Sequence, residues 1–518
     1  MSLKWLANIL AALALLAGTQ AHAEWHKATN EHFVFYADMD PAQLQRLAER
    51  LERFDAAMRV ITRARETRPV TIYMVRNMDE VQRLAGSRGV GGFYSGSTQE
   101  PLIVVPGRTG EVMERFDFDE VNILQHEYAH HMLLSNVDQF LPSWATEGMA
   151  EFFSTADVTR EGSVVLGATP TIRGFDLMLG NRWTARELLL SETRRVPSNE
   201  IGQRYARGWL LVHYLLLSGE RPDQYSAYVD ALNAGTPAAD AAAQVFGDLG
   251  DLDSDLTRYV RRRRLQGLEL GPNELTGLKP VTIAPLAAGA AAIMPYRITS
   301  ASGVDRETAR SLAEKAVPVA ARYPDDAFVQ RAFAEMQYDA RNLDQTIAAA
   351  ERAVTLEPGN VMAMVYRGRA TARQAKEQNS PELWREARSW FLRANRADPN
   401  HAQPFASYYD SFGAAGEVPN QSAQTGLRRA LVLAPQDTSL QVRLAVAMLR
   451  EGNLQSARKL LGPAAFDPHA GETNPARDAM RMIDEGATAE AILAEVGPKL
   501  APNEFADPPE DEAEGEGA

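Results

Sequence analysis

The spacing of apolar residues changes along the chain, and each spacing predicts a different kind of element. Residues 32–37 and 70–75 are short runs rich in β-branched and aromatic side chains, which predicts two strands. Between them, residues 41–63 carry apolar side chains at helical spacing, namely Leu44, Leu47, Leu51, Phe54 and Met58. This alternation predicts a small mixed α/β subdomain over residues 24–115.

From residue 116 to residue 275 the spacing is mainly helical. Four apolar segments fit helices: residues 183–190, 205–217, 224–234 and 238–246. Residues 271–302 are rich in Pro, Gly and Ala with few charges, and we expect a linker or cross-over between domains, with the linker placed at residues 276–302. The predicted fold class is α+β, in which a helical subdomain over residues 116–275 follows the small α/β subdomain.

The last third of the chain repeats. Apolar helical segments end at Pro324, Pro358, Pro399, Pro435 and Pro468, with gaps of 34, 41, 36 and 33 residues. An insertion around residues 376–381 explains the longest gap. Small and large residues recur at matching positions of the helical segments: Gly368, Ala387, Ala394, Ala423, Ala430 and Ala457 are small, and Phe391 and Leu427 are large.

Residues 303–485 therefore resemble tetratricopeptide repeats, whose period is about 34 residues. An unrelated helical bundle would not keep proline so regularly at the ends of its helices. The resemblance implies an all-α solenoid with a concave surface that binds a protein partner or an extended peptide.

Both ends of the chain carry distinctive segments. Lys4 precedes the apolar residues 5–18, and Ala21-His22-Ala23 has the pattern of a cleavage site, so we expect a signal peptide over residues 1–23 with cleavage after Ala23. This predicts a periplasmic or secreted protein with no stable membrane span after cleavage. At the other end, residues 486–518 predict a terminal helix and an acidic tail, disordered from residue 498 onward.

Composition limits the classes of function. With 518 residues and 45% hydrophobic content, the chain can build two or more domains with sizeable cores. The formal net charge of −14 argues against a nucleic-acid partner. The one basic run, residues 261–264, follows a helical pattern and is interpreted as a solvated helix end.

The strongest candidate chemistry lies in His126-Glu127-Tyr128-Ala129-His130. The segment around it lacks Gly and Pro and follows Asp117 and Asp119, which favours a helix that begins near residue 120. On a helix, His126 and His130 lie one turn apart on one face and can reach the same metal ion. Glu127 projects beside that face, where its carboxylate can take a proton from a water.

A second helix is expected from Pro142-Ser143, with Ser143 as its cap. Glu147 and Glu151 then share one face, so that Glu147 can be the third ligand while Glu151 orients a histidine ligand from behind. Two imidazoles and one carboxylate around an open position are typical of catalytic zinc, whereas structural zinc sites usually use cysteine, which this chain lacks. The expected cofactor is Zn²⁺, although Mn²⁺ or Co²⁺ could occupy the same ligands in vitro.

These two elements resemble those of the gluzincin metallopeptidases, in particular the peptidase MA-like domains of exported bacterial proteins. Such enzymes follow H-E-x-x-H with W-x-x-E-G-x-A-E, which residues 144–151 match. The resemblance implies that Glu147 is the third zinc ligand. It extends more weakly to Tyr205-Ala206-Arg207-Gly208, 58 residues after Glu147, which is similar to the Tyr-x-Lys-Gly element of aminopeptidase N-like enzymes.

That element implies a Tyr205 that stabilises the tetrahedral intermediate. The alternative is a tyrosine that only packs in the apolar helix around it. His131 is interpreted as a residue that packs or that supports a metal ligand from behind, and His213 as a histidine that packs in a helix.

One departure from the aminopeptidase pattern bears on the substrate. Aminopeptidase N-like enzymes hold the free amine of the substrate with a Gly-x-Met-Glu-Asn element before the zinc helix, and no such element precedes His126. Residues 102–105 instead predict a strand, interpreted as the sheet edge to which an extended peptide adds. We therefore favour an endopeptidase over an aminopeptidase.

The sequence thus predicts an exported zinc metallopeptidase with Glu127 as general base, whose repeats recruit a peptide substrate or a protein partner. The alternative is an inactive peptidase-like scaffold for protein–protein interaction in the cell envelope. Glu127 favours the enzyme, because a remnant that only bound metal or partners would not need a general base.

Overall fold

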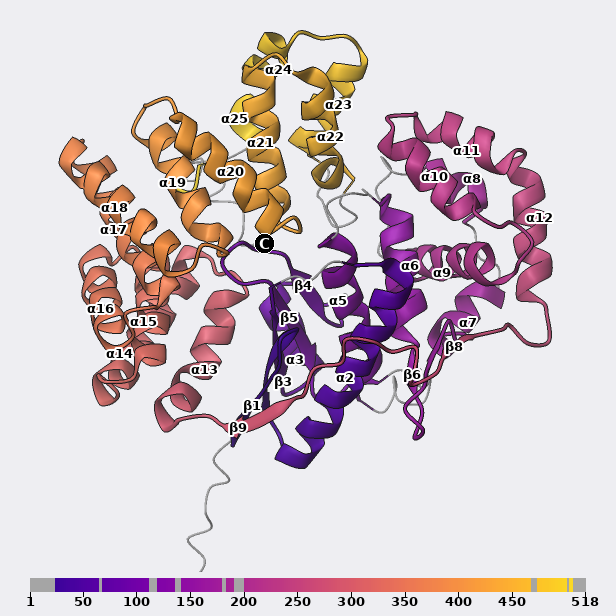
Figure 1. Cartoon of the computed structure of the whole chain (residues 1–518), viewed down its shortest axis with the longest axis horizontal. Helices are drawn as coiled ribbons and strands as arrows, with labels where there is room; N and C mark the ends of the chain where they lie inside the picture. The colour runs from indigo at the N-terminus through magenta and orange to yellow at the C-terminus, as the bar shows by residue number, and fades with distance from the viewer. Residues whose placement is uncertain are drawn as a thin grey trace, which may run out of the picture.

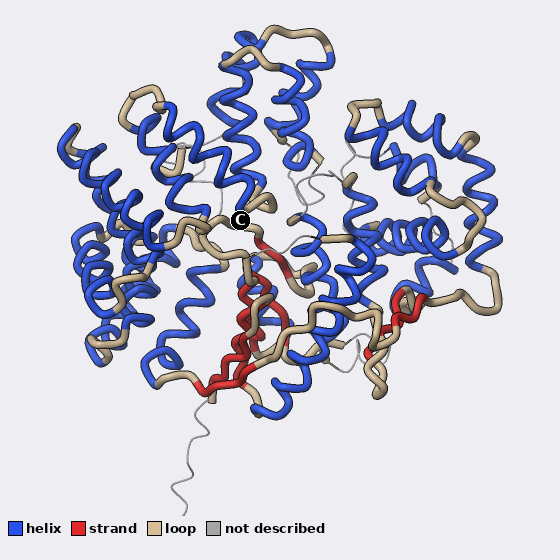
Figure 2. The backbone as a smooth tube through the Cα atoms, viewed as in Figure 1, coloured by secondary structure: helices blue, strands red, loops and turns tan. Residues whose placement is uncertain are grey.

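A computed structural model of the chain describes residues 24–64, 68–110, 119–135, 141–178, 183–190, 200–466, 473–500 and 503–505. A strand-containing region occupies the centre of the molecule, with a curved array of helix pairs on one side and a compact helical region on the other (Figures 1 and 2). The signal peptide expected over residues 1–23 lies outside the described residues, and so do Asp117, Pro468 and the tail from residue 506.

The central sheet has six strands in the order β4-β5-β3-β2-β1-β9. Strands β2, β3 and β5 are parallel to one another, and the other neighbours pair antiparallel. The bounds are β1 Trp25–Thr29, β2 Phe33–Asp38, β3 Val70–Val75, β4 Phe93–Ser95, β5 Leu102–Pro106 and β9 Thr282–Pro285. The strands predicted over 32–37, 70–75 and 102–105 are therefore confirmed.

Helices cover both faces of this sheet, which explains why every residue of β3 is buried. On one face, α2 (Pro41–Thr62) and α5 (Glu120–Leu134) share a core with Phe35 and Ile72. On the other face, α3 (Met78–Ala85) and α13 (Ala288–Ala301) share a smaller core with Tyr73 and Val104. The helix predicted over residues 41–63 is confirmed as α2.

The prediction of a linker over residues 276–302 is wrong, because most of this segment has regular secondary structure. This segment supplies β9, which pairs with β1, and α13, whose Met294 and Ile298 are buried against the sheet. The scarcity of charges that suggested a linker has a different cause. Ala, Ile and Met side chains fill the space between the sheet and the next helices, and few charges can be buried there.

The region after α5 is helical, as expected, with one small addition. Its helices are α6 Ser143–Ser154, α7 Thr171–Met178, α8 Ala185–Leu190, α9 Ile201–Leu217, α10 Gln224–Asn233, α11 Ala238–Phe246 and α12 Leu249–Val260. A three-stranded antiparallel sheet, β6 (Asp157–Val158), β7 (Val164–Leu166) and β8 (Leu268–Leu270), closes the region. The basic residues 261–264 are exposed, as predicted.

His213 is one of the residues that hold this region together. It is fully buried in α9, and its two ring nitrogens lie 2.9 Å from the hydroxyl of Tyr259 and 3.0 Å from the carbonyl of Gly167. It therefore ties α9 to α12 and to the end of β7, in agreement with the packing role predicted from the sequence.

The remaining chain forms antiparallel helix pairs that resemble tetratricopeptide repeats. The pairs are α13 with α14 (Arg306–Arg322), α15 (Ala327–Asp339) with α16 (Leu343–Leu356), α17 (Val361–Glu377) with α18 (Pro381–Ala397), α19 (Ala402–Ala414) with α20 (Gln421–Leu433), and α21 (Thr438–Arg450) with α22 (Leu454–Ala465). The first helices of successive pairs also contact one another from α13 to α19, which makes them the inner layer of the array.

Two local features of the repeats match the sequence pattern. A Cβ on Gly368 would lie 2.5 Å from the Phe391 ring, so the small residue in α17 admits the large one from α18. The insertion around residues 376–381 lies at the junction of α17 and α18, which have 17 residues each.

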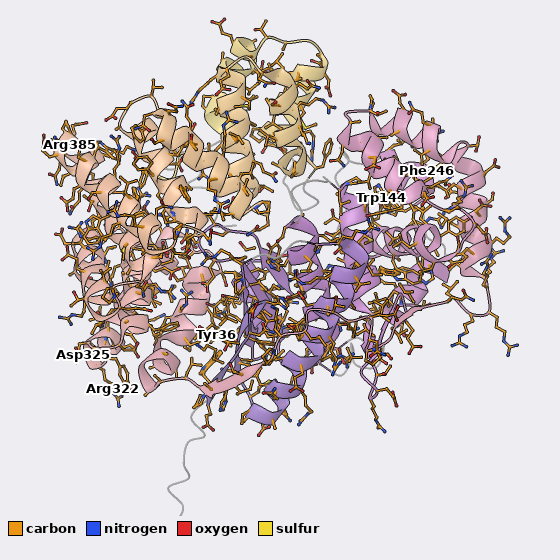
Figure 3. All side chains as sticks on the ribbon, viewed as in Figure 1. Tyr36, Trp144, Phe246, Arg322, Asp325 and Arg385 are labelled. Atoms are coloured by element: carbon orange, nitrogen blue, oxygen red, sulfur yellow. The ribbon has the colours of Figure 1, made fainter. Side chains whose placement is uncertain are left out.

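The inner layer of the repeats packs against the central sheet. Tyr36 of β2 lies 6.5 Å from Phe328 of α15, ring centroid to ring centroid, whereas Arg322, Asp325 and Arg385 lie on the outer rim (Figure 3). Arg297 of α13, only 1% exposed, contacts the carboxylates of Glu100 and Glu335.

The chain after the last repeat does not match the prediction in full. Helices α23 (Pro475–Asp484), α24 (Ala489–Glu495) and α25 (Gly497–Leu500) follow, and residues 503–505 lie against the inner layer of the repeats. Disorder from residue 498 onward is thus wrong for residues 498–500 and 503–505, because Leu500 and Phe505 are buried in apolar clusters. Within the described ranges, no helix is both long and apolar enough to cross a bilayer.

Candidate metal centre

Helix α5 begins where the sequence predicted, at a cap formed by Asp119. Its side chain accepts hydrogen bonds from the backbone amides of Val121 and Asn122, and the Asn122 side chain accepts from the backbone amide of Asp119. This capping box satisfies backbone donors that have no partner inside the helix. It fixes the start of the helix that carries His126, Glu127 and His130.

The two histidines and Glu147 converge. The Nε2 atoms of His126 and His130 lie 3.1 Å apart, and Glu147 Oε2 lies 3.6 Å from the first and 3.7 Å from the second. These ligand atoms all lie within 4.8 Å of one another. Glu147 is only 1% exposed, so its carboxylate faces the histidines and not the solvent.

Glu147 is placed by α6, every residue of which is buried. The helix begins at Ser143 with Pro142 as its N-cap and no side-chain cap, so the predicted capping role of Ser143 is wrong. Pro142 presets the backbone for helix entry. The Ser143 hydroxyl instead accepts a hydrogen bond from Arg204 of α9.

Two glycines set the distance between α6 and α9. A Cβ on Gly148 would lie 2.7 Å from the Gly208 carbonyl oxygen, and a Cβ on Gly208 would lie 3.1 Å from the Trp144 carbonyl oxygen. The helices cross at van der Waals distance only because both residues lack a side chain. These are the glycines of the two sequence elements that contain Glu147 and Tyr205, so the crossing fixes the position of Tyr205 relative to Glu147.

Glu127 lies between the histidines and the start of β4. A Cβ on Gly92 would lie 3.0 Å from Glu127 Cγ and 2.6 Å from Ile123 Cγ2. Glycine at position 92 therefore lets the chain that enters β4 pass close to Glu127, which is 8% exposed. The sequence pattern did not single out Gly92, because a lone glycine before a short strand carries no specific signal.

Glu151 lies behind His126 and is held by an arginine. Its Oε1 is 3.9 Å from His126 Nδ1, and Arg173 of α7 donates to both of its oxygens, at 3.2 and 2.7 Å. This bidentate pair lowers the pKa of Glu151 against the opposing effect of burial. Arg173 was missed in the sequence, since no motif includes it and α7 is short.

Tyr205 reaches the same site from α9. Its ring is stacked at 6.3 Å from that of His126, and the guanidinium of Arg173 lies 5.6 Å from its centroid. Burial, the charges of Glu147 and Glu151, and a hydrogen bond with Glu147 hold the pKa of Tyr205 well above its usual range. The phenol therefore stays protonated at ordinary pH values and can donate a hydrogen bond.

The charges of the site fit a divalent cation. The carboxylates of Glu127, Glu147 and Glu151 gather around the two histidines in a region of low exposure, and the guanidinium of Arg173 is paired with Glu151. Although burial lowers the pKa of His126, the hydrogen bond with Glu147 and the charges of the three glutamates raise it to about 9. Without a metal the site thus draws a proton onto an imidazole. Two imidazole nitrogens and a carboxylate are the donor set that Zn²⁺ takes in catalytic sites.

The neighbouring histidine has a different environment. His131 Nδ1 shares a hydrogen bond of 3.2 Å with the hydroxyl of Tyr94 in β4, and burial and the charge of Arg59 lower its pKa to about 3. His131 is thus a neutral packing residue, which is one of the two roles predicted for it. It ties α5 to β4.

The expectation that residues 102–105 form an edge of the sheet is wrong. This strand, β5, lies inside the sheet between β4 and β3, and the edge strand on this side is β4.

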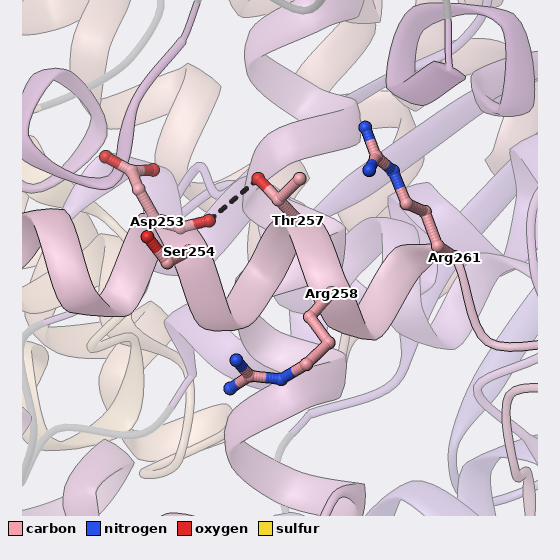
Figure 4. Close-up of a pocket in the computed structure, with 5 residues that line it drawn as sticks. All are labelled: Asp253, Ser254, Thr257, Arg258 and Arg261. Carbon is pink, nitrogen blue, oxygen red and sulfur yellow. Dashed lines mark hydrogen bonds between the residues drawn. The ribbon is translucent and has the colours of Figure 1, made fainter.

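A separate surface feature lies on α12. A shallow depression of about 480 Å³ is lined by Asp253, Ser254, Thr257, Arg258 and Arg261, with a hydrogen bond from Thr257 to the Asp253 carbonyl (Figure 4). It shares no residue with the metal centre. Asp253 accepts hydrogen bonds from Arg207 of α9 and from the amide of Ala185. Arg207 therefore points to α12, where its ion pair with Asp253 joins α9 to α12.

The solved structures that are similar to the chain include two with low identity and low TM-scores. The crystal structure of TTC0263, a thermophilic TPR protein of Thermus thermophilus, is 19% identical over 36% of this chain and 91% of its own, with a TM-score of 0.29. Yeast Tom70 is 13% identical over 75% and 76% of the two chains, with a TM-score of 0.25. With TM-scores this low, the description of the repeats rests on the helix pairs themselves.

Sequence comparisons add one match. No curated protein matches this chain. A family model described as "Protein of unknown function (DUF1570)" matches residues 120–238, which contain α5, α6, α7 and α9 and therefore His126, Glu127, His130, Glu147, Glu151, Arg173 and Tyr205.

Proposed function

We propose that the mature chain is an exported zinc-dependent endopeptidase, with Glu127 as general base and Tyr205 as hydrogen-bond donor to the oxygen of the scissile carbonyl. The observation that carries this proposal is the convergence of His126, His130 and Glu147 within 3.1 to 3.7 Å, with Glu127 on the same helix. A structural zinc site would have four protein ligands and no need of Glu127.

His126, His130 and Glu147 would hold the metal. When bound, Zn²⁺ would supply a Lewis acid that acidifies a coordinated water and polarises the substrate carbonyl. Glu151 and Arg173 keep the His126 ring oriented and its Nδ1 side polar. Such support around metal-binding histidines typically changes affinity or activity about 10- to 100-fold.

Glu127 and Tyr205 would handle protons and charge. The Glu127 carboxylate accepts a proton from the attacking water and delivers it to the leaving amine, a role worth about 100- to 10,000-fold in rate. Tyr205, whose pKa is held high, stays protonated and donates a hydrogen bond to the developing oxyanion. One well-placed donor of this kind contributes about 3 kcal/mol.

Strand β4 suggests how a peptide would lie. It is one of the two edge strands of the sheet, it pairs with β5 on one side, and its Tyr94 contacts α5 through His131. An extended substrate could add to β4 as a further strand and pass beside Glu127. Because no element for a free amine precedes α5, cleavage inside a chain is favoured over removal of terminal residues.

The proposal is tested with the mature chain from Glu24 and an unstructured protein substrate. The purified chain should contain about one zinc ion, and it should cleave the substrate until a chelator is added. The Glu127→Gln variant should keep its zinc and lose at least about 100-fold in rate. Zinc bound without cleavage by the unmodified chain would favour the scaffold, and equal cleavage by all samples would indicate a contaminating protease.

Two further assays address specificity and export. Peptides with an acetylated amino terminus should be cleaved as well as free ones, and strict dependence on a free amine would overturn endopeptidase activity. Expression of the full chain followed by fractionation should yield a periplasmic or secreted product that begins at Glu24. A product that keeps residues 1–23 in the cytoplasm would overturn export.

A further inference from the structure

The segment Asn503–Phe505 lies against α17 of the inner layer and against its partner helix α18. Phe505 is fully buried, and its ring lies 6.1 Å from that of Trp384 and 6.4 Å from that of Phe391, centroid to centroid. Alanines complete the pocket around the ring: Ala372, Ala375 and Ala387. Two aromatic side chains thus form walls of the pocket, and the small alanines leave the space that the Phe505 ring fills.

Glu504, which precedes Phe505, is bound by polar side chains of the repeats. Arg369 Nη2 donates to Glu504 Oε2 at 2.6 Å, and Gln403 Nε2 donates to the same oxygen at 3.3 Å. Arg369 is only 6% exposed, so its bond to Glu504 is screened little by water. A charge-assisted hydrogen bond in such a place discriminates strongly for a carboxylate.

The backbone of the segment is bound as well. Arg373 Nη2 donates to the Glu504 carbonyl at 3.1 Å, and Lys376 Nζ donates to the Phe505 carbonyl at 3.1 Å. Asn503 donates to the Asp410 carbonyl at 2.8 Å. Three cations, each about one turn from the next on α17, therefore line a path for a peptide main chain, with separate places for one acidic and one aromatic side chain.

We infer that the inner face of α17 to α19 is a peptide-binding site for an extended segment with an acidic residue followed directly by an aromatic one, and that Glu504-Phe505 is its intramolecular ligand. The recognition elements are side chains of the repeats, and the ligand is a short segment beyond the last helix. An external peptide of the same chemistry would have to displace it. This inference does not depend on the metal centre.

The site predicts competition between the tail and added peptide. A tethered ligand acts at a millimolar effective concentration, so vacating the site should raise the apparent affinity for an external peptide about tenfold or more. The probe is a fluorescein-labelled peptide with the sequence of residues 500–507, Leu-Ala-Pro-Asn-Glu-Phe-Ala-Asp. Its anisotropy is measured with the unmodified mature chain and with the Glu504→Ala, Phe505→Ala double variant.

The expected result is tighter binding to the double variant than to the unmodified chain, and no binding of a peptide with alanine at both positions. Glu504→Gln, which keeps the shape of the side chain, should also raise the affinity if the double variant does not fold. Lys376→Ala, added to either variant, should lower the affinity for the labelled peptide, because Lys376 binds the main chain of the segment. Glu490→Ala, an exposed change on α24, should match the unmodified chain. Failure of both vacated chains to bind, or equal binding of the alanine peptide, would overturn the inference.

Discussion

Arg173 offsets the repulsion between two buried carboxylates of the candidate centre. Glu147 and Glu151 lie one turn apart on α6 and are 1% and 2% exposed, and two such carboxylates repel each other in a region of low dielectric constant. The guanidinium of Arg173 binds Glu151 through both oxygens. It thereby leaves Glu147 as the carboxylate directed at the histidines, and its contact with the Tyr205 ring holds the phenol nearby.

Replacement of Arg173 by lysine should separate charge from geometry. Lysine keeps the positive charge but cannot form the bidentate pair with Glu151. We expect zinc affinity or turnover to fall about 10- to 100-fold, measured by competition with a chelating dye and by peptide cleavage. Arg160→Lys, an exposed change, should have no effect. Unchanged zinc affinity and turnover in Arg173→Lys would show that the bidentate pair with Glu151 is not required for either property.

His213 should give the protein a pH dependence of stability. Burial lowers its pKa from 6.5 to about 4, so the unfolded chain binds a proton at this site more readily than the folded one. The stability contributed by neutral His213 is complete above pH 6.5 and is lost as the pH falls through about 4, by up to about 3 kcal/mol.

Urea unfolding of the His213→Asn variant tests this. The variant should be less stable than the unmodified chain at pH 7, and the difference should shrink toward pH 4. A difference that stays constant between pH 7 and pH 4 would contradict the assignment of a lowered pKa to His213.

At the scale of single residues, the sequence could predict those site residues that belong to a recognisable motif. His126, His130 and Glu147 follow from helical spacing and ligand chemistry, and the structure brings them together. Arg173 and Gly92 could not be found, because their contacts come from the packing of α7 and β4 against α5 and α6. Glu504 and Phe505 were hidden for a different reason: the acidic composition around them is typical of disorder.

The crossing of α6 and α9 is the feature that matters most at the scale of elements. Gly148 and Gly208 let the backbones touch, and the helices thereby bring Glu147 and Tyr205 to one place. Any side chain at the crossing must push the helices apart.

Gly148→Ala should therefore be costly. Its Cβ would lie 2.7 Å from a backbone oxygen and 3.0 Å from Val212 Cγ2, so α6 or α9 must shift. We expect a loss of about 1–3 kcal/mol in the free energy of unfolding and weaker zinc binding. The matched control is Gly174→Ala in α7, where a Cβ meets nothing within 4 Å and should be neutral or stabilising. Equal effects of the two substitutions in urea unfolding would contradict this role for the crossing.

Elements were predicted well where one face of a segment is apolar and poorly where tertiary pairing decides. Helix α2 and strands β2, β3 and β5 carry strong local patterns. The edge position of β4 depends on which strand stays unpaired, and the three residues of β4 carry little signal. Strand β9 and helix α13 look like a linker in sequence because their partners, β1 and the far face of the sheet, lie far away along the chain.

At the scale of the whole molecule, a buried ion cluster links the sheet to the repeats. Arg297 of α13 contacts Glu100, which follows β4, and Glu335 of α15. Despite burial, the charge of Arg297 lowers the pKa of Glu100, together with Arg331. The cluster therefore joins the region beside the metal centre to the first two helix pairs.

Arg297→Ala should weaken this connection strongly. Removal of one partner from a buried ion pair leaves uncompensated carboxylates, at a cost of about 3–5 kcal/mol. We expect a large drop in the urea midpoint by tryptophan fluorescence and circular dichroism. Arg306→Ala on the exposed start of α14 should change stability by less than about 0.5 kcal/mol. A similarly small effect of Arg297→Ala would indicate that other contacts, such as the ion pair of Arg68 with Asp398 and the hydrogen bond from Tyr366 to Gln99, suffice to join the two regions.

Because α13 packs on the sheet and also belongs to the first helix pair, the chain cannot be divided between the region of the candidate metal centre and the repeats without damage. A truncation before residue 282 would remove β9 from β1 and leave an unpaired strand edge. It would also uncover Tyr73 and Val104, where Met294 and Ile298 are buried. Such a fragment should aggregate on expression. The shortest soluble form of the region with the candidate metal centre must extend through Ala301.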